Sequence, residues 1–178
     1  PSTRYKALAG CHNIRHENFP DGLSALSSPD GINWHPLRDT AVITQKNFAF
    51  DSQNVSFWSE EESCYVCYFR TWETKHGPLR TISRTTSPDF INWTPAKAME
   101  PNLPGENLYV SQTFPYFRAP HIYLATPTRF MADRVSSTDI LFMSTRAGSS
   151  SYQRLFTEAF LRPGMETARW GNRANYLA

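Results

Sequence analysis

The chain has 178 residues, of which 40% are hydrophobic and 14% aromatic, which is enough for the core of one globular domain and short for two. Its formal net charge is +2, and its 18 lysines and arginines are scattered along the sequence, which indicates neither a nucleic-acid partner nor an acidic membrane surface. No apolar run approaches the roughly 20 residues that a membrane-spanning helix needs. We expect one soluble domain over residues 1–178. Because the first residues show no signal-peptide core, the compartment stays open between secreted, periplasmic and cytoplasmic.

Alternating segments rich in β-branched and aromatic residues predict β-strands throughout the chain. In chain order they are 22–27, 32–37, 54–58, 63–72, 79–86, 91–96, 121–130, 138–145 and 153–161. Helix is not favoured, because the candidate at 131–135 is short and the one at 157–165 is interrupted by Pro163 and Gly164. The sequence therefore predicts an all-β fold.

One turn motif recurs along the chain. SPDGINWHPL, beginning at Ser28, returns as SPDFINWTPA at Ser87, 59 residues later, and a weaker copy, STRAGSSSYQRL, begins at Ser144. Serine and aspartate side chains cap tight turns, so Asp30 and Asp89 are assigned to capping and not to chemistry. Each motif therefore marks a hairpin turn between two strands.

The repeat predicts the architecture. Strands flank each turn and further strands lie upstream, so four strands per unit is the simplest count. A unit of roughly 40 to 60 residues with four antiparallel strands is typical of a β-propeller blade. We expect blades at approximately 1–45, 46–100 and 110–165, with another starting at 171–178. Since propellers close with roughly four to eight blades, this chain would be part of a propeller that further residues or association complete.

Polar residues open three of the predicted strands. In a propeller the innermost strand of each blade begins at the mouth of the central channel, so side chains at these starts converge on one cavity. We align FDSQNVSF, FRAPHIYL and NRANYL as such starts, which makes two sets of residues equivalent: Asp51, Arg118 and Arg173, then Asn54, His121 and Asn175. A carboxylate between guanidinium groups favours a polar ligand, although residues of this kind also serve only to join blades.

The motifs RAPHIYL and FDSQNVSFW, with the four-stranded repeat, resemble those of the five-bladed propeller glycoside hydrolases of family 43 and its relatives in families 32, 62 and 117. The resemblance covers most of the chain in architecture and only these short motifs in sequence. It implies that Asp51 is the blade-opening aspartate that orients the acid or tunes its pKa, and that His121 lines the sugar subsite. Arg118 stands where those enzymes place the general-acid glutamate, and a guanidinium cannot deliver a proton near neutral pH.

A glycoside hydrolase normally places two carboxyl groups at the scissile bond, so a second one is needed beside Asp51. We assign Glu106, in a Pro- and Gly-containing loop before a blade entry, although most glutamates of exposed loops are only solvated charges. Glu158, Asp21 or a residue of further blades are the alternatives.

Three functions are compatible with these patterns. The first is a glycoside hydrolase in which Asp51 acts and the polar residues at the strand starts position the sugar. The second is a non-catalytic propeller that binds an acidic or sulfated glycan through Arg118 and Arg173, with Trp58 and Trp72 as stacking faces. The third is a sialidase-like propeller, since Ser-x-Asp-Gly-x-x-Trp is similar to the aspartate boxes of sialidases. Here the box is one residue shorter, so it supports the fold more than the reaction.

The remaining reactive residues indicate neither a metal site nor a cofactor. Cys64 and Cys67 lie three positions apart in one predicted strand, so they face opposite sides of the sheet. Cys11, His12 and His16 lack a fourth partner nearby. No phosphate-binding loop, nucleophile elbow or zinc-protease helix is present. We therefore expect a carbohydrate as the ligand, with no cofactor, metal, nucleic acid or membrane.

Overall fold

The computed structural model describes residues 3–10, 22–44, 50–73, 78–100, 103–110, 112–164 and 168. Within these ranges the chain forms fourteen β-strands in antiparallel sheets, and no described residue is helical. The predicted all-β class is confirmed. No described segment is a helix with the length and apolar character needed to cross a membrane.

The first sheet is built around a central strand. It contains β1 (Tyr5–Gly10), β2 (Gly22–Ser28), β3 (His35–Pro36) and β4 (Ile43–Thr44). One edge of β2 pairs with β1, and the other pairs with β3 at one end and β4 at the other. A Cβ atom on Gly22 would lie 2.6 Å from the carbonyl oxygen of Ile43, so the approach of β4 requires glycine there.

The second sheet contains the longest strands. β5 (Val55–Ser59), β6 (Cys64–Glu73), β7 (Leu79–Ser87) and β8 (Lys97–Ala98) pair in this order. The pairing of β6 with β7 runs without interruption from Tyr65 and Ser87 to Glu73 and Leu79. The strands predicted at 54–58, 63–72 and 79–86 are therefore confirmed.

The last two sheets are formed by the same three bent segments of chain, with the β11–β12 segment in the centre. One sheet contains β10 (Thr113–Tyr116), β11 (Ala119–Ala125) and β14 (Met143–Arg146), and the other contains β9 (Leu108–Val110), β12 (Thr128–Met131) and β13 (Ser137–Ile140). Backbone bonds continue across the bends, since the N–H of Thr126 donates to the carbonyl of Gln112 and that of Leu141 to Pro127, at 2.8 and 3.0 Å. The two sheets therefore continue one another along these three segments.

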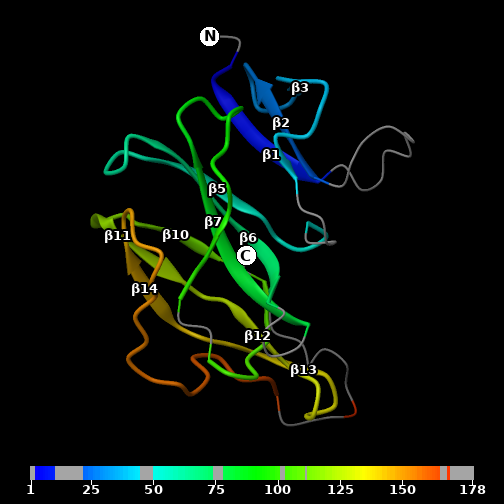
Figure 1. Cartoon of the computed structure of the whole chain (residues 1–178), viewed down its shortest axis with the longest axis vertical. Helices are drawn as coiled ribbons and strands as arrows, with labels where there is room; N and C mark the ends of the chain where they lie inside the picture. The colour runs from blue at the N-terminus through cyan, green and yellow to red at the C-terminus, as the bar shows by residue number, and fades with distance from the viewer. Residues whose placement is uncertain are drawn as a thin grey trace.

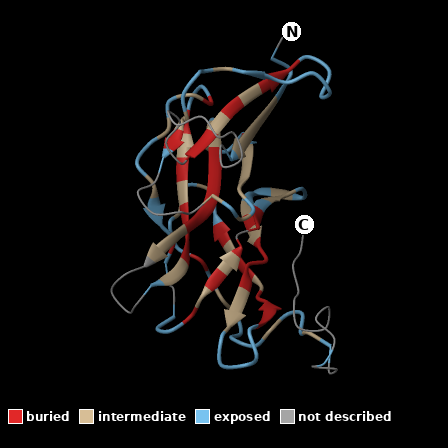
Figure 2. Ribbon diagram, turned by 90° about the vertical axis from the view of Figure 1, so that its right-hand side faces the viewer, coloured by how far each residue is buried: buried red, intermediate tan, exposed pale blue. Residues whose placement is uncertain are grey.

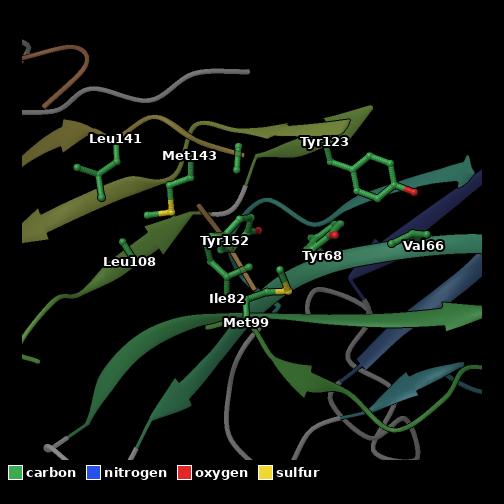
Figure 3. Packing of buried hydrophobic residues seen from close by; sticks show 10 residues of the cluster. Val66, Tyr68, Ile82, Met99, Leu108, Tyr123, Leu141, Met143 and Tyr152 are labelled. Carbon is green, nitrogen blue, oxygen red and sulfur yellow. The ribbon is translucent and has the colours of Figure 1, made fainter. Parts of the chain in front are cut away.

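The second sheet lies between the first sheet and the β10–β11–β14 sheet, and each of its faces packs against one of them (Figure 1). Because successive residues of a strand face opposite sides, β6 directs Tyr68 to one side and Phe69 to the other. Tyr68 joins a buried cluster with Tyr123 and Met143 (Figure 3), and Phe69 packs with Leu23. Buried residues accordingly follow the strands, while the turns are exposed (Figure 2).

The two repeated turns have the hydrogen bonds that their sequences predict. In the first, Ser28 Oγ accepts the N–H of Gly31 and Asp30 Oδ1 accepts that of Asn33, both at 2.8 Å. The second turn, at residues 87–92, repeats these bonds at 2.9 and 2.7 Å. Backbone N–H groups thereby hold the pKa of both aspartates far below the usual range.

The equivalent residues Gly31 and Phe90 both adopt a left-handed backbone, with φ of 81° and 71°. Glycine tolerates this conformation, whereas a phenylalanine is disfavoured there. Phe90 is buried, and its ring centroid lies 4.9 Å from that of Tyr65 and 5.6 Å from that of Trp93. Packing of the ring therefore offsets the cost of the turn.

A strand that the sequence alignment did not predict, β10, precedes the segment FRAPHIYL. β10 ends at Tyr116, and Arg118 lies in the tight turn that leads to β11. The predicted equivalence of FRAPHIYL and FDSQNVSF is wrong, because β10 corresponds to β5 as the first strand of its hairpin. Pro115 conceals β10 in the sequence, yet a proline is tolerated in a strand at the edge of a sheet.

Candidate functional site

Asp51 lies in the bend that leads into β5, and its side chain is 40% exposed. It forms an ion pair with Arg70 of β6, whose side chain is only 3% exposed. The amide of Asn54 donates to the carbonyl oxygens of Phe50 and Ser52, at 3.2 and 2.8 Å, and so fixes the bend. The fold thus presents one accessible carboxylate on a buried guanidinium.

A hydrogen bond between two glutamines joins the bend before β5 to the start of β10 beside Asp51. Gln53 precedes β5 and is exposed, Gln112 precedes β10 and is buried, and the amide of Gln112 donates to the side-chain oxygen of Gln53. The two residues are 59 positions apart, which is also the spacing of the repeated turns. The starts of β5 and β10 therefore meet at the end of the molecule that carries Asp51.

Two arginines and two aromatic rings support this end of the second sheet. The guanidinium of Arg70 lies 5.5 Å from the ring centroids of both Trp72 and Tyr109. That of Arg80 lies 4.9 and 4.7 Å from the same two rings. Such contacts are favourable for a cation that has been removed from water. They fix the guanidinium that contacts Asp51, and they occupy the ring of Trp72, which the sequence assigns to sugar stacking.

Three buried polar atoms near Asp51 have no hydrogen-bond partner among the described residues. They are the hydroxyl oxygen of Ser52, the amide oxygen of Asn54 and Nε of Arg70. Buried polar atoms are normally satisfied, by protein, by water or by a ligand. Because these three atoms are buried, the groups of the bend that a ligand can contact are the exposed carboxylate of Asp51 and the exposed amide of Gln53, which suit hydroxyl groups as partners.

Glu106, the second predicted catalytic carboxylate, is buried in a different ion-pair cluster. Both of its oxygens accept hydrogen bonds from Arg154, at 2.7 and 3.1 Å, and Arg129 lies 3.7 Å away. Its side chain is 5% exposed, so it is not the solvated loop charge that its sequence context suggested. No hydrogen bond or ion pair between described residues joins Glu106 to Asp51.

The structure does not place Arg118 and His121 at the Asp51 end of β5. Arg118 is exposed in the turn beyond the far end of β10, and its guanidinium lies 5.2 Å from the ring centroid of Phe117. His121 is exposed in β11, where its backbone oxygen accepts the N–H of Ala147 at 2.9 Å. Ligand binding by these two residues stays a prediction.

The remaining predicted residues divide into two groups. Arg173 and Asn175 lie outside the described residues, as do Asp21, Cys11, His12 and His16. Glu158 is described and exposed, and Trp58 is 41% exposed, with its ring packed edgewise on Tyr65 at 4.9 Å. Within the part of the chain that the structure describes, no group of three or more histidine, cysteine, aspartate or glutamate residues could hold a metal ion.

The two described cysteines lie in β6, as predicted, and neither forms a disulfide. Cys64 packs against the cluster that contains Tyr68, and Cys67 belongs to the cluster on the other face with Phe69. The opposite orientation that their spacing predicted is confirmed. Burial strongly raises the pKa of the Cys67 thiol, so this residue is a part of the core and not a nucleophile.

Sequence reasoning missed Arg70, Gln53 and Gln112. Arg70 lies in the middle of a strand, where its partner Asp51 is 19 residues away and nothing local indicates the contact. The two glutamines carried a usable signal, because adding the repeat period of 59 to Gln53 gives Gln112. Applying the period to every polar residue, and not only to the turns, would have located this pair.

Comparison with known proteins assigns no family: no family model and no curated protein matches the chain. The geometry around Asp51 is therefore the basis on which a function is inferred.

Proposed function

We propose that this chain is part of a β-propeller of the glycoside hydrolase type, and that it binds a carbohydrate at the end of β5 that carries Asp51. Three features of the fold support the architecture. The units repeat with a period of 59 residues, the second sheet packs on both faces against neighbouring sheets, and the first strands of two units meet through Gln53 and Gln112. Adjacent blades of a propeller pack in this way.

The observation that carries the proposal is the convergence of Asp51 with the paired glutamines. Asp51 accepts hydrogen bonds, and the carboxamide of Gln53 both donates and accepts them, which suits the vicinal hydroxyl groups of a sugar. Arg70 holds the carboxylate from the buried side and leaves its outer face accessible. Asp51 would accordingly act as a carboxylate, either as a general base for water or as the group that stabilises positive charge at the anomeric carbon.

Hydrolysis also requires a proton donor on the leaving-group side. Glu106 is poorly suited to this role, because its two oxygens accept hydrogen bonds from a buried arginine. In the hydrolase proposal the acid is therefore another residue, and Glu158, Asp21 and residues of further blades are the candidates. This same observation favours a second candidate function, a propeller that binds the carbohydrate at Asp51 without cleaving it.

Reducing-sugar release from neutral, uronic and sulfated polysaccharides tests the proposal, with binding to the same panel measured in parallel. The variant is Asp51→Asn, and Asp39→Asn, which neutralises an exposed aspartate of the first repeat unit, is the control. Turnover that Asp51→Asn abolishes and Asp39→Asn preserves supports the hydrolase. Binding without turnover, lost only in Asp51→Asn, supports the binding protein. Binding that both variants retain would contradict the proposal.

A further inference from the structure

A polar hollow, separate from the Asp51 bend, is lined by side chains of β12, β13 and the turn between them. The β12–β13 hairpin lies at the lower end of the molecule in Figure 1. Glu158, Ala159, Arg162 and Pro163 complete the lining, and the cavity volume is about 460 Å³. The stretch from 158 stays beside β13 because Leu161 pairs with Ile140 through backbone hydrogen bonds. Ligand pockets of small molecules occupy roughly 300 to 1,000 Å³, so the hollow has room for a monosaccharide.

The floor of the hollow is a saturated ion pair. Arg129 of β12 donates through Nε and Nη2 to the two carboxylate oxygens of Asp139 on β13, at 2.9 and 2.7 Å. Its third nitrogen, Nη1, donates to the carbonyl oxygen of Thr157 at 3.2 Å. Arg129 and Asp139 are also directly opposite one another in the strand register. This pair fixes the shape of the hollow, and its charges largely cancel.

The rim of the hollow carries two further arginines from different elements. Arg134 lies in the turn between β12 and β13, and Arg162 directly follows the residue that pairs with β13. Both are exposed, and neither forms an ion pair with any residue that the structure describes. Glu158 is the one other acidic residue of the lining, so the rim is left with more positive than negative charge.

The turn that presents Arg134 has an unfavourable backbone. Val135 and Ser136 are consecutive non-glycine residues with positive φ, 55° and 53°. A β-branched residue is rare in this region, and such conformations cluster where they orient a functional side chain. Hydrogen bonds from Arg134 N to Met131 O and from Ser137 N to Arg134 O, at 3.3 and 3.1 Å, close the turn. Arg134 is thereby held at the mouth of the hollow.

We propose that this hollow binds the carboxylate or sulfate group of an acidic sugar, with Arg134 and Arg162 as its ligands. Guanidinium groups bind such oxyanions with paired, charge-assisted hydrogen bonds, and an anion supplies the negative charge that the rim lacks. The exposed carboxylate of Glu158 provides acceptors for sugar hydroxyl groups. The anion site stands on the geometry of the hollow alone, whereas its assignment to a sugar rests on the proposed function.

Calorimetric titration with glucuronate and with glucose 6-sulfate tests the proposal, with glucose and inorganic sulfate as comparison ligands. We compare the whole chain with the variant Arg134→Ala/Arg162→Ala. The control is Arg38→Ala/Arg146→Ala, which removes the same charge from two exposed positions outside the hollow. Matching thermal unfolding midpoints establish that the variants are folded.

The expected result is saturable binding of an acidic sugar and not of glucose. The dissociation constant should rise about tenfold or more in Arg134→Ala/Arg162→Ala, and change less than about twofold in the control. Equal affinity in the two double variants, or no saturable binding of either acidic sugar, would overturn the proposal, and binding of inorganic sulfate alone would overturn the sugar assignment. Asp51→Asn should leave this binding intact, so failure of the Asp51 site and failure of the hollow are distinguishable.

Discussion

Asp51 and Glu106 are both carboxylates paired with arginine, yet the fold uses them in opposite ways. Asp51 is 40% exposed and contacts one arginine, whereas Glu106 is 5% exposed and lies against two. A buried carboxylate with two guanidinium partners is a fixed acceptor, and its removal leaves buried charge behind. An exposed one can exchange its outer contacts with a ligand. Exposure to solvent therefore distinguishes a carboxylate that can bind a ligand from one that only stabilises the fold. The position of an acidic residue just before a strand does not.

The largest expected effect on the free energy of unfolding is that of replacing Glu106, the buried carboxylate. Glu106→Gln removes one partner of a buried ion pair and leaves Arg154, whose side chain is 6% exposed, without a counter-charge. We expect the free energy of unfolding to fall by about 3 to 5 kcal/mol, as measured by urea denaturation. The exposed Glu158→Gln should change it by less than about 0.5 kcal/mol. Equal effects of the two variants would show that the ion pair of Glu106 does not stabilise the fold.

A third carboxylate, Glu62, extends the comparison to pH. Burial raises its pKa, but hydrogen bonds from Tyr123, the backbone of Gly148 and Arg84 outweigh this and hold the pKa below 4.5. A group whose pKa is lowered on folding stabilises the protein above its unfolded pKa, and this stabilisation is lost as pH falls through the folded value.

Glu62→Gln should therefore lower the free energy of unfolding at pH 7, and the difference from the wild type should shrink below pH 4.5. Urea denaturation across pH 3 to 7 measures both. A difference that stays constant over this range would contradict the assigned hydrogen bonds.

The exposed member should matter less to stability. Asp51→Asn removes the counter-charge of Arg70, but the Asp51 side chain is 40% exposed, so water replaces part of the lost interaction. We expect a loss of about 1 to 2 kcal/mol in urea denaturation, clearly less than for Glu106→Gln. A loss as large as that of Glu106→Gln would show that Asp51 mainly stabilises the fold through its ion pair with Arg70.

The smallest effect is expected at the glutamine pair. Gln53 is exposed, so Gln53→Ala removes one hydrogen bond between two repeat units and should cost about 1 kcal/mol or less. The ligand that the polysaccharide panel identifies should also bind more weakly, as measured by titration. The loss of binding free energy should exceed the loss in free energy of unfolding. Unchanged affinity would exclude Gln53 from the site.

Local features of the fold were predictable from sequence. The turns at Ser28 and Ser87 follow from side chains that bond to N–H groups two or three residues away, so the motif alone determines them. β6 and β7 were equally clear, because their residues alternate between two buried faces. Such features depend on interactions within a short stretch of chain.

Long-range features were not predictable in the same way. The strand β10 was missed because Pro115 argues against a strand unless the strand is known to lie at an edge, which is a property of the sheet. This error moved the predicted site to Arg118. The partners of Glu106 are 23 and 48 residues away, so its burial could not be read from its loop. At the bend before β5 the sequence identified Asp51 and Asn54, and the repeat period could have added Gln53 and Gln112, whereas Arg70 required the structure.

Carbohydrate binding at the Asp51 bend is tested most directly by NMR titration of the isotope-labelled chain, which maps binding onto the backbone amides. We expect chemical-shift changes to concentrate at Ser52, Gln53, Asn54 and Gln112, and Asp51→Asn to remove them. Shift changes centred on Arg118 and His121 instead, unaffected by Asp51→Asn, would contradict the placement of the site at the start of β5.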